Sequence, residues 1–370
     1  MSKSITLIGI LLGLLLVWGL GRCVQASYIK IKNPSGIQEA YFITIPARAS
    51  IPAMQMAVQI RGEDIKNPVV VFIHGGPGGP HATLNYLFQR PLEDKYTFVN
   101  YDQRGSGRTY YANSPDTPVS FDLCLEDLDA LVDWVREYLQ QKQIILMGHS
   151  WGSILGIEYI KQHPEKVKAY VGLAQEVNPI AEEELNVEAA SRIARTLNRE
   201  EEVNIMQTAF WEFQEAAKRG HVNREALKTF QALTLGKYFS PDNPSLLLYL
   251  QAGPFASEMT WTDLRWYAKL VFQSGKVAEI ERPLEQYLVQ YHNQTYLYHV
   301  PVYLLSGKDD RVTPVKIIQD FYRKIEAPQK DFILIPHCGH TPFFERPFSF
   351  QKAFLSLPFN KERKAENTPD

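Results

Sequence analysis

The chain has 370 residues, of which 45% are hydrophobic and 12% aromatic, enough to form a large buried core. Its 39 basic and 41 acidic side chains leave a formal net charge of -2, so no basic excess indicates a nucleic-acid partner. The sequence contains no phosphate-binding loop, dinucleotide fingerprint or spaced Cys/His cluster. We therefore expect no cofactor and no metal.

The first predicted element is an uncharged, leucine-rich stretch at residues 5–21. Seventeen residues lie at the lower limit for a membrane span and just above the hydrophobic part of a signal peptide. We predict a single N-terminal membrane anchor. A cleaved signal peptide, ending near Ala26 and giving a secreted or periplasmic protein, is the alternative. Basic residues flank the stretch on both sides, so the side of the membrane stays open.

Strands and helices are then predicted to alternate. The expected strands are residues 40–46, 54–61, 69–73, 97–101, 144–147 and 167–173, and the expected helices are residues 121–140 and 153–163. From about residue 178 to 298 the alternation gives way to a helical, aromatic-rich insertion, after which strands return at 302–306 and 332–335. This order predicts an α/β fold with a mainly parallel sheet, helices on both faces and an inserted helical cap.

The predicted domain organisation follows from the same pattern. It comprises residues 1–26 as anchor or signal, 27–177 and 299–360 as the two parts of the α/β core, 178–298 as the cap and 361–370 as a polar tail.

A glycine-rich segment follows the predicted strand at residues 69–73. It reads His74-Gly75-Gly76-Pro77-Gly78-Gly79-Pro80. A developing oxyanion needs backbone N–H donors, and glycine lets the chain approach a substrate closely. We predict that the amide of Gly76, or alternatively Gly75, is one donor and that the amide of Trp151 is the other.

A second segment lies between a predicted strand and a predicted helix. It reads Gly148-His149-Ser150-Trp151-Gly152. In this context the pattern G-x-S-x-G predicts a nucleophile elbow, in which a sharp turn exposes the serine hydroxyl and tolerates only small residues two positions away. Ser150 is therefore the predicted nucleophile.

A serine hydroxyl is a weak nucleophile at neutral pH, so it needs a histidine base and a carboxylate that orients the histidine. Asp310 and His340 each follow a predicted strand end, in the chain order Ser, Asp, His that the α/β-hydrolase fold requires. We predict Asp310 as the acid and His340 as the base. Asp309 and His337 are the alternatives, because a small change of loop register would exchange them with the chosen residues.

Together these segments resemble the prolyl iminopeptidase group of α/β-hydrolase serine peptidases. The resemblance rests on the two segments above and on Asp102-Gln103-Arg104-Gly105-Ser106-Gly107-Arg108, and it spans roughly residues 55–178 and 299–350. Residues 307–314 are similar to that group's G-x-x-D-x-x-x-P acid loop, which supports Asp310. His149 departs from the glycine that the group usually has in the elbow. The run at residues 102–108 has a simpler interpretation as a tight turn.

The resemblance also implies that carboxylates of the cap hold the free amino terminus of the substrate. Glu212, between Trp211 and Phe213, is the candidate. We therefore predict a serine hydrolase that acts through an acyl-enzyme on a small peptide or amide, as an aminopeptidase of the prolyl iminopeptidase type. A carboxylesterase or lipase-like hydrolase of small acyl esters is the alternative, and a noncatalytic ligand receptor on the same fold is the third hypothesis. The oligomeric state is left open.

Overall fold

The computed structural model describes residues 2–48, 51–239 and 256–359 and contains one eight-stranded sheet. The strand order is β1-β2-β4-β3-β5-β6-β7-β8. The strands are β1 (Ile37–Ile45), β2 (Met54–Gly62), β3 (Val69–Ile73), β4 (Thr97–Tyr101), β5 (Ile144–His149), β6 (Val167–Leu173), β7 (Val302–Gly307) and β8 (Lys330–Ile335). Only the pairs β1–β2 and β2–β4 are antiparallel, and the other five pairs are parallel. The predicted fold class is confirmed.

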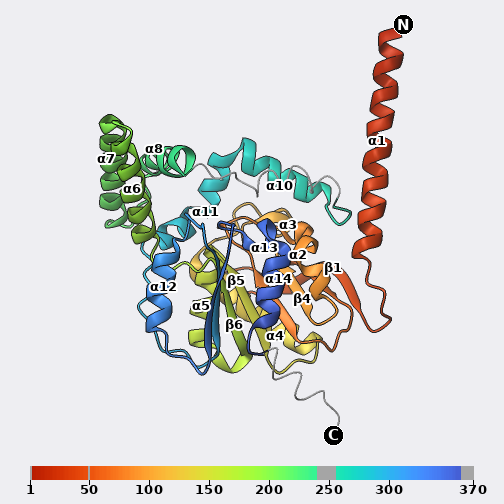
Figure 1. The fold of residues 1–370 in the computed structure, drawn as a ribbon. Coiled ribbons are helices and arrows are strands. Elements are labelled where there is room, and N and C mark those ends of the chain that lie inside the picture. The colour runs from red at the N-terminus through yellow and green to blue at the C-terminus, as the bar shows by residue number, and fades with distance from the viewer. Residues whose placement is uncertain (1, 49–50, 240–255, 360–370) are drawn as a thin grey trace.

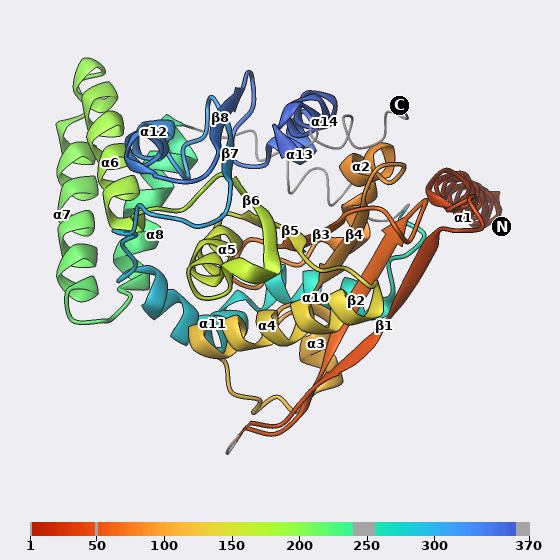
Figure 2. The ribbon, with the colours of Figure 1, turned by 90° about the horizontal axis from the view of Figure 1, so that it is seen from below.

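Helices cover both faces of the sheet (Figures 1 and 2). The hydrophobic core on one face includes Leu128, Ile154 and Ile318. The core on the other face includes Phe88, Phe343 and Phe354. The first face carries α4 (Phe121–Tyr138), α5 (Trp151–Gln162) and α12 (Val315–Lys324); the second carries α2 (Tyr86–Gln89), α13 (Pro342–Glu345) and α14 (Pro347–Ser356). Every residue of β3 and β5 is buried, as expected for central parallel strands packed on both sides.

The remaining short elements connect the strands. They are 3-10 turns at Ala82–Leu84, Arg90–Leu92 and Pro164–Lys166, and helix α3 (Gly107–Ala112), which follows β4.

All cap helices lie between β6 and β7 in the chain. They are α6 (Pro179–Thr196), α7 (Glu200–Ala217), α8 (Arg224–Leu233), a π-helical turn at Thr234–Tyr238, α10 (Trp261–Phe272) and α11 (Ser274–Leu288). Helices α6 to α8 form a bundle at one flank with its own aromatic core, whereas α10 crosses above the sheet (Figure 1). Helix α10 is fixed to the core by a bidentate ion pair between Arg108 and Asp263, with both distances 2.8 Å. We propose that this segment is the cap expected at residues 178–298.

The predicted membrane anchor is wrong. Residues 5–21 belong to helix α1 (Ser2–Ile29), but among the described residues no helix combines the length and the apolarity needed to cross a membrane. Seventeen helical residues extend only about 26 Å, short of a hydrocarbon core of about 30 Å. The helix then continues to the body of the protein, where Arg22 Nη2 donates to the Ser257 carbonyl at 2.9 Å and Ile29 is buried.

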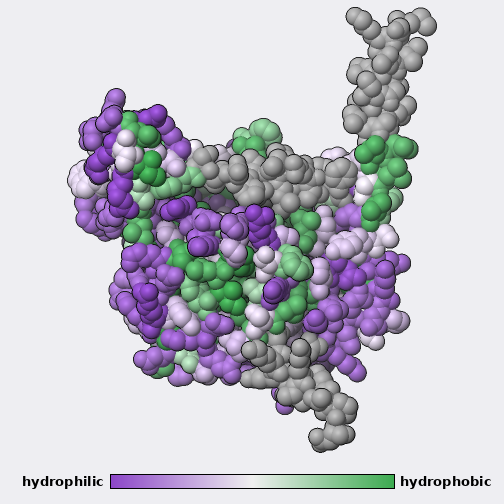
Figure 3. Space-filling view, in the orientation of Figure 1, coloured by the Kyte–Doolittle hydropathy of each residue, from purple (hydrophilic) through white to green (hydrophobic). Residues whose placement is uncertain are grey.

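The membrane partner and the localisation that we predicted from that anchor are corrected with it. What the structure does show of α1 is an apolar surface on its described side chains, where Leu16, Val17 and Val24 are exposed (Figure 3).

Candidate active site

Ser150 occupies a strained turn between β5 and α5. Its φ of 51° lies in the left-handed region, which non-glycine residues seldom adopt and which often marks functional positions. A Cβ atom at Gly148 would collide with the Gly152 carbonyl, and one at Gly152 would collide with the carbonyls of Ile73 and His74. These contacts are the physical reason why small residues flank the serine at both positions.

The turn also leaves one backbone amide, that of Trp151, without an acceptor in its own helix. The Ser150 amide donates to the Leu173 carbonyl of β6 at 3.0 Å, which fixes the turn against the neighbouring strand. Trp151 is the first residue of α5, so its own amide has no acceptor within the helix and carries the positive end of the helix dipole.

The glycine-rich loop after β3 packs directly on this elbow. A Cβ atom at Gly75 would lie 2.8 Å from His149 Nδ1 and 3.2 Å from Ser150 Cβ, so the loop backbone can approach the serine only because residue 75 is glycine. Gly76 follows with a φ of 130°, which also favours glycine. The structure therefore brings Gly75 against Ser150, to which Trp151 is bonded in the chain, and Gly76 is the residue after Gly75.

Gln103 connects three loops behind the elbow. Its backbone N–H donates to His74 Nε2 at 3.1 Å. In its side chain, Nε2 donates to the His74 carbonyl at 2.7 Å and Oε1 accepts from Trp151 Nε1 at 3.0 Å. The turn at residues 102–108 is pinned by a hydrogen bond of 2.7 Å from the Arg108 amide to Asp102 Oδ2. These contacts favour the structural interpretation of that run.

The acid and base candidates meet at the ends of β7 and β8. His340 Nδ1 lies 3.0 Å from Asp310 Oδ2 and 3.3 Å from Oδ1. The same carboxylate accepts hydrogen bonds from the Val312 amide (2.8 Å), the Thr313 amide (3.0 Å) and Thr313 Oγ1 (2.7 Å). The side chain of Asp310 is fully buried, whereas that of His340 is 22% exposed and can meet a substrate.

This pairing determines the charges of both groups. Burial by itself would raise the pKa of Asp310, but the neighbouring His340 and the donors of Thr313 hold it below its usual range. Burial by itself would lower the pKa of His340, but the charge and hydrogen bond of Asp310 raise it. Asp310 is therefore ionised and stabilises a protonated His340.

The two alternative residues point elsewhere. Asp309 is exposed, and its amide donates to the Cys338 carbonyl at 3.0 Å. His337 is exposed and turns the chain with a φ of 57°. The hydrogen-bonded pair consists of Asp310 and His340.

Two residues that the sequence did not single out for this role hold the histidine loop. Glu345 accepts from the Gly339 amide at 2.7 Å and from the Thr341 amide at 3.0 Å, on either side of His340. His149 Nε2 donates to the His340 carbonyl at 2.9 Å, and the two imidazole rings are 4.9 Å apart. Because His149 precedes Ser150, this contact connects the elbow directly to the histidine loop.

A carboxylate of the cap lies against the glycine-rich loop. Glu281 of α11 abuts Gly78, where a Cβ atom would collide with the carboxylate, and the indole of Trp266 donates to the Gly78 carbonyl at 3.0 Å. Glu281 Oε1 is buried and has no hydrogen-bond partner among the described residues. Burial, followed by the charge of Glu285, raises the pKa of Glu281 to about 8. Sequence reasoning missed Glu281, because its neighbours give no sign that it is buried.

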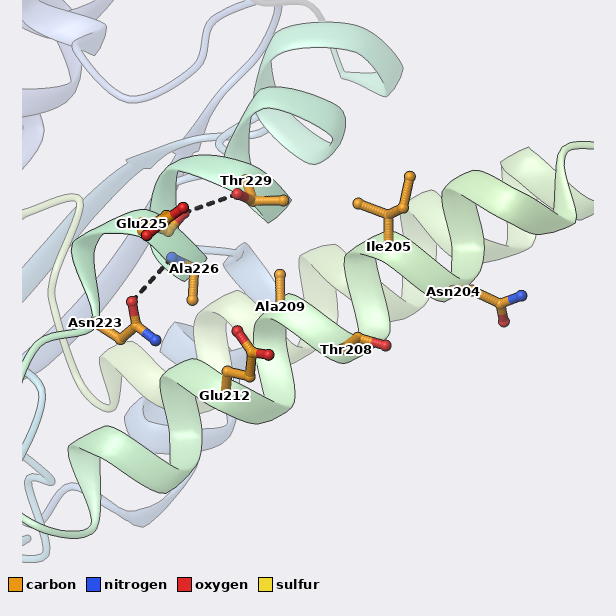
Figure 4. A pocket seen from close by; sticks show the side chains of 9 residues that line it. All are labelled: Asn204, Ile205, Thr208, Ala209, Glu212, Asn223, Glu225, Ala226 and Thr229. Atoms are coloured by element: carbon orange, nitrogen blue, oxygen red, sulfur yellow. Dashed lines mark hydrogen bonds between the residues drawn. The ribbon is translucent and has the colours of Figure 1, made fainter.

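Glu212 is not brought together with these groups. It is exposed on α7 and lines a pocket of about 420 Å³ whose other residues belong to α7, α8 and the turn before α8 (Figure 4). Its role stays a prediction. Among the described residues, no group of three or more His, Cys, Asp or Glu side chains is placed to hold a metal ion.

Comparisons with known proteins agree with this architecture. The chain is 29% identical over 334 residues to "Probable aminopeptidase YbaC" of Bacillus subtilis, an alignment that covers 85% of this chain and 96% of that protein. It is 24% identical over 302 residues to a proline iminopeptidase of Lactobacillus delbrueckii subsp. bulgaricus, covering 80% and 92% of the two chains. The crystal structure of a proline iminopeptidase-related protein from Thermus thermophilus superposes with a TM-score of 0.51 at 20% identity, covering 86% and 96%.

The family model described as "alpha/beta hydrolase fold" matches residues 68–347, which include the glycine-rich loop, the elbow, the cap and the pair of Asp310 and His340. The resemblance to the prolyl iminopeptidase group is confirmed by these relatives. The chain belongs to the α/β-hydrolase family.

Proposed function

We propose that this hydrolase acts through an acyl-enzyme formed on Ser150, with His340 as base and Asp310 as the orienting acid. The observation that carries the proposal is the hydrogen bond of 3.0 Å between His340 and a fully buried Asp310, on a loop that His149 connects to the nucleophile turn. A serine, an imidazole and a buried carboxylate in this arrangement form the machinery of acyl transfer.

The proposed reaction has two halves. Ser150 Oγ attacks the substrate carbonyl while His340 Nε2 takes its proton, and Asp310 holds Nδ1–H and stabilises the imidazolium. The amides of Trp151 and of Gly76 or Gly75 bind the oxyanion. His340 then returns the proton to the leaving amine or alcohol. Water repeats the sequence on the acyl-enzyme and releases the acid.

We infer further that the substrate is a small peptide or amide with a free amino terminus, as the names of the aminopeptidase relatives indicate. A substrate ammonium needs an anion at a site from which water is excluded. Glu281 is the candidate in the cap, because it lies against the loop proposed to supply the oxyanion donors and its Oε1 lacks a partner among the described residues. Its pKa of about 8 means that the free protein holds it protonated at neutral pH, and that the carboxyl becomes the anion when an ammonium group binds beside it. Glu212 is the earlier candidate and lies on a different pocket.

The test is a paired activity screen of the purified full-length protein. Aminoacyl arylamides, including the prolyl compound, are compared with the same compounds acetylated at the amine and with short-chain acyl esters. We expect turnover of the free arylamides and weak turnover of the acetylated ones. Turnover of esters alone would replace the peptidase by the esterase, and no turnover or serine-directed labelling at all would favour the noncatalytic receptor.

A further inference from the structure

Two buried glutamates beside the triad have no part in the mechanism above. Glu176 lies three residues beyond the end of β6 and is 6% exposed, and Glu182 lies in the first turn of α6 and is 2% exposed. Buried carboxyl groups are unfavourable unless they are paired or hydrogen-bonded. Their contacts therefore indicate what holds them there.

Glu182 is fixed as an acceptor. Its Oε1 accepts from the Val177 amide at 3.1 Å and from the Asn178 amide at 3.2 Å. It also lies at the N-terminus of an 18-residue helix, where the helix dipole stabilises a negative charge. Burial raises the pKa of Glu182 above its usual range, and the two amide donors and Glu176 act against that rise by favouring the ionised form.

Glu176 is placed to hold a proton. Its amide donates to Ser153 Oγ at 2.9 Å, in the first turn of the helix that Ser150 begins, and its side chain is hydrogen-bonded to Glu182. Two carboxyl groups in contact cannot both be ionised at low cost. Burial, together with the charge of Glu182, raises the pKa of Glu176 well above its usual range, so Glu176 donates and Glu182 accepts.

The face of α6 that carries Glu182 packs on the acid loop. Asn186 lies four residues further along α6, on the same face, and its Nδ2 donates at 2.5 Å to the carbonyl of Arg311, the residue after Asp310. The charged groups that act on His340 are Asp310, Glu182 and Glu345. His149 is neutral, because burial keeps its pKa well below the usual range.

We propose that Glu182 is a positioning residue for His340, a second fixed negative charge that protonated Glu176 holds in place behind the Asp310–His340 pair. The inference rests on the proposed triad. Asp310 orients the imidazole by a hydrogen bond, whereas Glu182 stabilises its protonated form through space. Because the triad needs neutral His340 before attack, Glu182 also sets the pH below which the serine loses its reactivity.

The test follows the rate at which a serine-directed fluorophosphonate labels the protein as a function of pH, which requires no knowledge of the substrate. In Glu182→Gln we expect the acid inflection to move down by about one pH unit, the scale of shift that a nearby buried charge causes. Glu188→Gln, on the exposed surface of the same helix, is the matched control and should leave the inflection unchanged. A slower rate at every pH with the same inflection would show a merely structural role and overturn the proposal.

A second pair of variants tests whether protonated Glu176 donates a hydrogen bond to Glu182. This pair also tests the proposal if Glu182→Gln does not fold. Glu176→Gln keeps a donor toward Glu182 and should retain the wild-type inflection. Glu176→Leu removes the donor, so Glu182 binds a proton more readily and the inflection should move down. Equal inflections in these two variants would overturn the proposal, and labelling that persists in Ser150→Ala would overturn the triad and this inference together.

Discussion

The acid loop and the cap helix α11 each place a carboxyl group near the elbow or its glycine-rich loop, but in different environments: Asp310 is buried, and Glu281 is half-buried with its Oε1 atom buried. Asp310 accepts from two backbone amides, a hydroxyl and an imidazole, and its pKa is lowered despite burial. Glu281 has an oxygen without a partner among the described residues, and its pKa is raised to about 8. Asp310 is therefore stabilised as an anion within the protein, whereas Glu281 keeps its proton up to about pH 8 and would ionise at neutral pH only beside a cation.

In the proposed function this difference separates the group that takes part in catalysis from the group that recognises the substrate. A catalytic acid must have its geometry before the substrate binds, so its hydrogen bonds are built into one short loop. A side chain that recognises a substrate can lack a partner in the free protein, because the substrate supplies that partner on binding and the free energy of pairing then contributes to selectivity. On this proposal, Glu281 lowers the stability of the free protein and contributes to selectivity.

The largest effect is expected from removing the nucleophile. Ser150→Ala should abolish fluorophosphonate labelling and lower turnover about a millionfold, the scale of loss when a triad nucleophile is removed. The variant should fold, because alanine fits the space of serine. Mass spectrometry of the labelled protein is the measurement, and a label on any other residue would refute the assignment.

The next largest effect is a loss of turnover that we expect on substitution of Asp310 but not of its exposed neighbour Asp309. Asp310→Asn should lower turnover by about four decades, because an amide in place of the carboxylate favours the wrong imidazole tautomer. Asp309→Asn is the matched control and should stay within a few-fold of wild type, since Asp309 is exposed and only its backbone contacts the histidine loop. Steady-state kinetics of both variants decide the matter, and a large loss in Asp309→Asn would contradict the assignment.

Local sequence was enough to predict the sharp turn at Ser150 and the two residues, Asp310 and His340, that the structure joins by a hydrogen bond. The turn at Ser150 depends on residues that are close in sequence: the strand before it, the helix after it and the glycines at 148 and 152. One short segment therefore contains all the features that predict the turn. The choice of Asp310 over Asp309 also came from a local pattern. The parallel sheet then brings the strand ends together, as parallel sheets do.

The cap could not be predicted in the same way. The sequence drew attention to Glu212 because aromatic residues flank it, but α7 turns that position outward. Glu281 Oε1 is buried because α11 returns to the glycine-rich loop, a contact between residues about two hundred positions apart. The anchor prediction at residues 5–21 was also wrong, because no helix among the described residues is long and apolar enough to cross a membrane; α1 instead continues past this stretch to Ile29, which is buried.

A smaller effect on activity is expected from substitution of Glu281. Glu281→Gln should reduce kcat/KM for free aminoacyl arylamides by about 10 to 100-fold, the scale of losing one charged hydrogen bond, and leave acetylated substrates nearly unchanged. The selectivity for a free amine should therefore fall. Glu212→Gln is the matched control in the cap and should keep that selectivity. The opposite pattern would return the recognition role to Glu212.

The last effect concerns stability rather than activity and follows from the raised pKa of Glu281. In the unfolded chain this carboxyl ionises near its ordinary pKa of 4.5, whereas in the folded protein it keeps its proton up to about pH 8. Stability is therefore lost as the pH rises through this window, by about 1.4 kcal/mol for each pH unit. Glu281→Gln has no such titration, so urea unfolding should show it more stable than wild type by about 2 to 4 kcal/mol at pH 8 and by little at pH 5. An equal change in the stability of Glu281→Gln at both pH values would mean that the folded protein does not raise the pKa of Glu281.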